Sequence, residues 1–175
     1  MLWNDFVELD VYDNVINNPY IRGLTAENLR KILTERCIYS YYPVRTLSFA
    51  VDYQIWGLLP FGFGLTNGLI HLTNVLLAFW LILRLFRQPA GGRFPSKDHA
   101  APGPSRPENN DWWEVCVAAF GAALFAVHPV VVEPVAWVCG REELLMTLGA
   151  LGAIHFHIAA RRLEESRDKA TQAIL

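Results

Sequence analysis

Apolar residues gather in three long stretches of the chain, and most charged residues lie between them. The first stretch covers residues 62–86, and about 25 residues of helix at 1.5 Å per residue are enough to cross a hydrocarbon layer of ~30 Å. The second covers residues 112–127 and is short for a span unless residues 130–132 extend it. The third covers residues 144–160. This pattern predicts an all-α membrane protein with about three transmembrane helices.

The segment 1–61 contains no apolar stretch long enough to span a membrane. A short helix is expected over 25–33, with the threonine at its start as N-cap. A second helix is expected over 44–58, because apolar residues recur there at helical spacing, at Leu47, Val51, Ile55 and Leu58. Two charged residues, Arg45 and Asp52, interrupt its apolar character, so we expect it to lie in the membrane interface. The segment is therefore predicted as an acidic loop followed by two interfacial amphipathic helices.

Positive charges alternate from one loop to the next. Lysines and arginines are frequent in 87–111 and in 161–175, whereas 128–141 contains only Arg141. Because basic residues favour the cytoplasmic side, we expect 87–111 and 161–175 in the cytoplasm, and 1–61 and the short loop 128–141 outside. The linker 87–111 is rich in proline and glycine and is expected to be disordered.

The composition supports a membrane protein, with 53% hydrophobic and 18% charged residues. The net charge of −2 and the lack of a basic stripe argue against nucleic acid as a partner. Cys37 and Cys139 fall on the same predicted side and could pair, or they could remain two isolated thiols. His155 and His157 are too few for a metal site, so no metal ligands are predicted.

Three blocks of sequence carry a family resemblance. They read FVELDVYDNVINNPYIRGLT, then YYPVRTLSFAVDYQIWGLLPFGFGLTNGLIHLTNVLLAF, then FAVHPVVVEPVAWVCGREELL. In this order they resemble the N-terminal membrane part of the transmembrane and tetratricopeptide-repeat containing proteins. That family belongs to the C-type glycosyltransferase superfamily, which includes the protein O-mannosyltransferases. The resemblance covers about residues 6 to 160.

The resemblance implies a membrane enzyme that takes a sugar from a polyprenyl-phosphate carrier and transfers it to a protein hydroxyl or another extracytoplasmic acceptor. It places the catalytic base in the first outer loop, where Asp10 is the first candidate and Asp13 the second; the alternative is that both are solvated loop carboxylates. Arg45, beside Tyr42, is expected to hold the donor phosphate, or else to snorkel to the lipid headgroups.

Further substrate contacts are expected from polar residues at the membrane boundary. His71 forms a polar stripe with Asn67 and Asn74, which either contacts substrate or makes hydrogen bonds between helices. A predicted cluster in the loop 128–141 serves either a site or a local ion-pair network, and its members are His128, Glu133 and Arg141.

The chain departs from the family pattern in several places. Relatives have two adjacent acids where this chain has Asp10 followed by Val11, and commonly a histidine where it has Gly64. They also have a membrane helix before the first block, with more helices and tetratricopeptide repeats after the third. We therefore expect an N-terminal fragment that is inactive and inserts poorly by itself, or alternatively a non-catalytic membrane scaffold derived from such an enzyme. A transporter subunit is not favoured, because no acidic or basic residue lies in the middle of a span.

The expected partners are membrane lipid, the polyprenyl-phosphate sugar donor and an acceptor protein. No bound cofactor is expected, and the sequence leaves dependence on a divalent metal open. The expected location is a bacterial inner membrane, or the endoplasmic reticulum in a eukaryote.

Overall fold

A computed structural model describes residues 9–36, 41–87 and 112–174, and these residues form helices and turns without a strand. The first elements are short: α1 (Leu9–Val11), the π-helix η1 (Tyr12–Ile16), the 3-10 helix η2 (Pro19–Arg22) and α2 (Ala26–Thr34). They are followed by α3 (Pro43–Trp56), α4 (Pro60–Phe86), α5 (Trp112–Val127), α6 (Pro129–Ala136), the 3-10 turn η4 (Val138–Gly140) and α7 (Arg141–Ile174).

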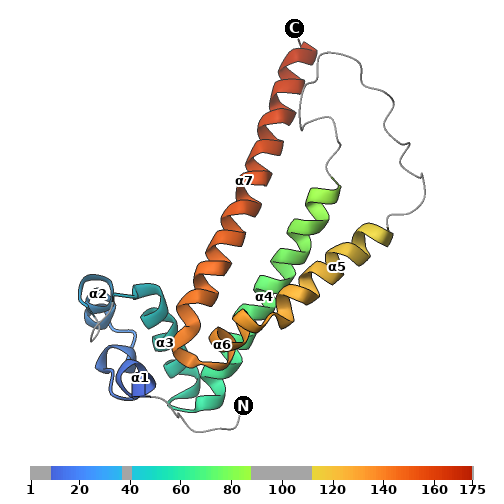
Figure 1. Ribbon diagram of the computed structural model, residues 1–175. Helices are drawn as coiled ribbons and strands as arrows, with labels where there is room; N and C mark the ends of the chain where they lie inside the picture. Colours follow the sequence, from blue (N-terminus) through green and yellow to red (C-terminus); the bar gives the residue numbers. More distant parts are fainter. Residues whose placement is uncertain (1–8, 37–40, 88–111, 175) are drawn as a thin grey trace.

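Three helical units can account for the predicted spans. The helix α4 and the stretch 138–172, which contains α7, are each long and apolar enough to cross a membrane. The pair α5 and α6 qualifies as a third span only if both helices count together, because they meet at an angle of 57°. Figure 1 shows α4, α5 and α7 leading away from a cluster formed by α1, α2, α3 and α6. The all-α class with about three candidate spans is confirmed.

Two boundaries differ from the sequence prediction. The predicted loop 128–141 consists largely of α6 and η4, because Pro129 occupies the first helical position, where its missing N–H is harmless. The third helix begins at Arg141 and continues far beyond the predicted end at residue 160. Its extension contains no glycine or proline and many good helix formers, among them Arg161 and Arg162.

Both predicted helices of the N-terminal segment are confirmed. The Thr25 hydroxyl accepts a hydrogen bond from the backbone N–H of Asn28 at 3.2 Å and so caps α2 as expected. On the exposed face of α2 a hydrogen bond from Lys31 lowers the pKa of Glu27 below its usual value. The helix α3 ends at Gly57, whose φ of +62° is a left-handed conformation that suits glycine.

The face that α3 buries was not the expected one. Arg45 and Asp52 lie on the buried face of α3, whereas Val51 and Ile55 are exposed. The interfacial position expected for this helix stays a prediction, and an exposed apolar face is compatible with it. In a membrane-facing helix charged groups are stable where they find partners inside the protein, and apolar side chains can face lipid at little cost.

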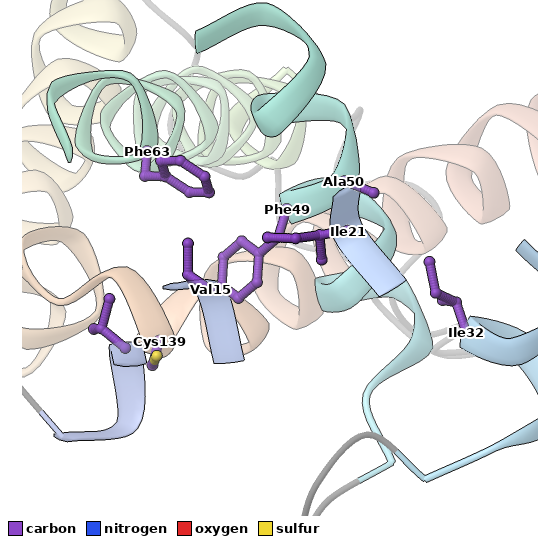
Figure 2. Packing of buried hydrophobic residues seen from close by; sticks show 8 residues of the cluster. Val15, Ile21, Ile32, Phe49, Ala50, Phe63 and Cys139 are labelled. Carbon is purple, nitrogen blue, oxygen red and sulfur yellow. The ribbon is translucent and has the colours of Figure 1, made fainter. Parts of the chain in front are cut away.

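A small apolar core joins segments that are far apart in sequence. It includes Val15 of η1, Ile21 of η2, Phe49 of α3, Phe63 of α4 and Cys139 of η4. Figure 2 shows these side chains around Phe49, whose ring centroid lies 5.9 Å from that of Phe63. The core fixes the N-terminal turns against the start of α7. Whether Cys139 pairs with Cys37 stays open, because Cys37 lies outside the described residues.

Candidate anion-binding site between α3 and α7

Arg45 is the central side chain of the candidate site. It lies in the first turn of α3 and is almost completely buried. Its Nη1 contacts both carboxylate oxygens of Glu142, at 3.2 and 3.3 Å, and its Nη2 donates to Oδ1 of Asn14 at 2.8 Å. The ring of Tyr42 lies 4.6 Å from the guanidinium carbon, within the range of a cation–π contact. The guanidinium is therefore oriented by three different segments.

A cavity of about 230 Å³ opens beside this guanidinium. Its walls come from residues 41–45 at the start of α3 and from Glu142, Leu145 and Met146 of α7. Apart from Arg45 and Glu142 the lining is apolar or aromatic. Such a cavity combines a place for a hydrocarbon chain with one fixed cation.

The two candidate bases lie on the neighbouring N-terminal turn. Asp10 belongs to α1 and Asp13 to η1, and both are exposed. Between them and Arg45 stands Asn14, which donates to the backbone carbonyl of Asp10 at 2.8 Å while accepting from Arg45. The acidic turn is thus attached to the arginine through one side chain, and its carboxylates remain accessible from solvent.

Beneath the cavity lies a second, fully buried ion pair. Nη1 of Arg141 is 2.6 Å from Oδ2 of Asp52, and the two side chains are 0% and 4% exposed. Arg141 also donates to Oδ1 of Asn67 at 2.6 Å and to the backbone carbonyl of Phe63 at 2.8 Å. The hydroxyl of Thr66 donates to Oδ1 of Asp52 at 2.8 Å. Arg141 therefore holds α3, α4 and α7 together and is not among the residues that line the cavity.

The two ion pairs are reciprocal. The helix α3 supplies Arg45 and Asp52, and α7 supplies Glu142 and Arg141, so each helix gives one cation and one anion. The hydroxyl of Ser48 connects the pairs, because it donates to the carbonyl of Arg45 at 2.6 Å and accepts from Arg141 at 3.3 Å. The outer pair borders the cavity and the inner pair does not.

The predicted cluster of His128, Glu133 and Arg141 is separated in the structure. His128 is exposed and caps α6 by accepting from the N–H of Val130 at 3.3 Å. Glu133 is exposed in α6, whereas Arg141 is buried against Asp52. The three residues therefore have different surroundings, since Arg141 pairs with Asp52 of α3 and the other two are exposed.

The polar stripe of α4 makes contacts between helices. Nε2 of His71 lies 3.1 Å from the carbonyl of Ala126, and Asn74 donates to the carbonyl of Leu144 at 3.0 Å. Asn67 donates to the carbonyls of Pro134 and Trp137, both at 3.1 Å. These hydrogen bonds join α4 to backbone carbonyls of α5, of the α6–η4 region and of α7, which is the structural role among the two that the sequence left open. No group of three potential metal ligands occurs among the described residues.

Comparison with known proteins decides the family. The chain is 36% identical over 137 residues to the protein O-mannosyl-transferase Tmtc3 of Drosophila melanogaster, a match that covers 78% of this chain and 14% of the relative. It is 28% identical over 170 residues to the protein O-mannosyl-transferase F38B6.6 of Caenorhabditis elegans, covering 93% of this chain and 21% of the relative. The human protein O-mannosyl-transferase TMTC4 is 35% identical over 113 residues, or 62% of this chain and 13% of the relative. The predicted resemblance to the transmembrane and tetratricopeptide-repeat containing family is confirmed.

The chain spans about a fifth or less of the length of these family members. No protein-family profile matches the chain, and no solved structure matches it.

Three residues of the site were missed by sequence reasoning, even with the family in view. They are Asn14, Asp52 and Glu142. A signal for Asp52 was present, because it follows Arg45 by seven positions and so lies on the same face of a helix. Glu142 directly follows Arg141, and nothing local distinguishes it from the exposed Glu143. Only the packing of α7 against α3 shows which of the two acids reaches Arg45.

Proposed function

We propose that this chain forms the donor-binding side of a membrane glycosyltransferase that takes its sugar from a polyprenyl-phosphate carrier. The names of its relatives, which are protein O-mannosyl-transferases, support sugar transfer. The observation that carries the donor class is the cavity beside Arg45. A buried guanidinium suits a phosphate, which it can contact through two N–H groups at once. The apolar walls suit the first units of a hydrocarbon chain.

The acidic turn supplies the base in this proposal. Asp10 takes the proton of the acceptor hydroxyl while that oxygen attacks the anomeric carbon of the sugar. The bond between this carbon and the phosphate oxygen breaks, and the carrier leaves as its phosphate. Asp13 supports the turn and is the second candidate. A base in this place must be accessible to an acceptor, and both carboxylates are exposed.

The proposed site lies on the extracytoplasmic side. Charge alternation favours an outer position for 1–61 and the α6 region, and α1, α2, α3 and α6 lie at one end of the molecule (Figure 1). The acceptor is a protein hydroxyl, and the chain acts as the N-terminal part of a longer enzyme.

The donor site is tested by binding of farnesyl phosphate to the chain in lipid nanodiscs, with farnesol as the neutral control. The wild type is expected to bind the phosphate more tightly than the alcohol. Arg45→Lys is expected to lose about tenfold in affinity, because an ammonium does not reproduce a two-pronged contact. Equal binding of farnesol and farnesyl phosphate would contradict the proposal.

Catalysis is tested in a chimera in which this segment replaces the matching 137 residues of the Drosophila relative. Asp10→Asn keeps the shape of the side chain and removes the base, so transfer is expected to fall by about 10²–10⁴-fold at normal expression. Asp13→Asn is expected to cost much less. If Asp13→Asn abolishes transfer and Asp10→Asn does not, the base is Asp13.

The second candidate function is a non-catalytic scaffold. The observation in its favour is that the acidic pair of the family is reduced to Asp10 followed by Val11. Full transfer by both aspartate variants, or no transfer by the wild-type chimera, would support the scaffold.

A further inference from the structure

The cavity beside Arg45 contains an anion of its own. Glu142 lines it together with Arg45, and among the described residues of the lining these two are the charged ones. Their closest N–O distance is 3.2 Å. The lining therefore has a formal charge near zero, although a site for a phosphate is usually positive.

The backbone of Glu142 is held next to α3, because Glu142 directly follows Arg141. The inner pair of Arg141 and Asp52 is fully buried and holds the same two helices together directly beneath. The Glu142 side chain is 22% exposed and belongs to the cavity lining. A ligand phosphate must therefore share Arg45 with this carboxylate at close range.

The charge of the ligand then determines how strongly its phosphate is repelled by the Glu142 carboxylate. A phosphodiester carries one negative charge, whereas a phosphomonoester carries about 1.5 to 2 near pH 7. Each additional charge on the ligand is repelled by Glu142, and the pair of Arg45 with Glu142 has no net positive charge to offset this repulsion. We infer that Glu142 makes this site select phosphodiesters over phosphomonoesters.

This inference rests on the proposed function and adds which form of the carrier the site binds better. A sugar linked to a polyprenyl phosphate is a phosphodiester, and the carrier released by transfer is a phosphomonoester. Glu142 therefore favours the loaded donor and promotes release of the spent carrier. It is a specificity-determining residue that acts by repulsion.

The test compares farnesyl phosphate with its methyl ester at pH 8, where the former carries two charges and the latter one charge and one additional methyl group. Binding to the chain in nanodiscs is measured by calorimetry. The wild type is expected to bind the methyl ester more tightly, by about tenfold. Glu142→Gln is expected to tighten farnesyl phosphate more than the ester and so to abolish the preference. Glu142→Asp keeps the charge and should keep the preference, as should the matched control Glu143→Gln on the exposed neighbour.

The outcomes separate this inference from the function beneath it. Suppose that farnesyl phosphate and its methyl ester both bind better than farnesol. The inference about Glu142 is then wrong if the wild type does not prefer the ester, or if Glu142→Gln retains the preference, while the proposed donor site is still supported. The wild-type comparison alone decides this if Glu142→Gln fails to fold. If neither phosphate binds better than farnesol, both fail. Bilayer lipids are phosphodiesters too, and loss of ester binding on adding phosphatidylglycerol would overturn the assignment to the sugar donor.

Discussion

Four charged side chains at the contact of α3 and α7 are buried or half-buried, and each has its partner on the other helix. A buried charge is tolerated when it is paired and hydrogen-bonded, but loss of one partner leaves the other uncompensated. The inner pair, Arg141 with Asp52, has the more complete set of contacts. It is thus expected to contribute more to stability than the outer pair, Arg45 with Glu142, which lines the cavity.

Asp52→Asn tests this division at the residue level. It leaves Arg141 without a counter-charge in a place shielded from water, and we expect a loss of about 3–5 kcal/mol in stability. The measurement is thermal unfolding of the purified chain in detergent, followed by size-exclusion chromatography. Glu143→Gln on the exposed side of α7 is the control and should leave the melting temperature unchanged. An unchanged melting temperature in Asp52→Asn would show that the pair contributes little.

The residues of the site were predictable only in part. Arg45, Tyr42 and the acidic turn were named from the resemblance, and the structure brings Arg45 and Tyr42 to one cavity. Arg141 was grouped with His128 and Glu133, whereas in the structure it pairs with Asp52. The position of a charge near a membrane boundary does not show which helix it will contact. The buried partners depend on how α3 and α7 pack, and this information is not local in sequence.

At the scale of elements, close backbone contacts fix the α6–η4 region. A methyl group added to Gly140 would lie 2.8 Å from the Cα atom of Pro134, which belongs to α6. Backbone cannot yield as a flexible side chain does, so the two segments would have to separate. The carbonyls that Asn67 binds, those of Pro134 and Trp137, belong to this same region.

Gly140→Ala is therefore expected to lower the melting temperature of the chain, because overpacking typically costs about 1–3 kcal/mol. Gly149→Ala and Gly68→Ala are matched controls in α7 and α4, where nothing lies within 4 Å of the added carbon. Both should be neutral or slightly stabilising, since alanine favours a helix over glycine. A melting temperature of Gly140→Ala equal to that of the controls would contradict the close packing.

The helices themselves were largely predictable, in contrast to the faces they bury. Length and apolar periodicity define α4, and a threonine cap defines the start of α2. Periodicity alone cannot show whether an apolar stripe faces protein or lipid, and for α3 it faced outward. The 128–141 region was assigned to a loop because it lies between two apolar stretches, whereas Pro129 starts a helix and Pro134 lies within it.

For the whole molecule, the orientation in the membrane can be tested by labelling. Single cysteines replace Arg30 in α2, Glu133 in α6 and Ser166 in α7, all exposed, in a chain whose native cysteines have been removed. On intact cells a membrane-impermeant maleimide is expected to label the first two positions and to spare the third. Lysed cells, in which all three should react, provide the control. Labelling of the third position alone would reverse the orientation and remove the proposed site from the outer face.

The reciprocal pairing of α3 and α7 also has a consequence for biosynthesis. Glu142 follows Arg45 by 97 residues, so at about 5–20 residues per second the ribosome needs roughly 5 to 20 s to supply the partner. During that interval α3 carries an unmatched arginine and an unmatched aspartate. Burial of such charges without partners is costly. We therefore expect α3 to remain in water or at the lipid surface until α7 has been synthesised. The final arrangement is therefore completed late, and a chain interrupted before α7 would expose the charged face of α3 to quality control.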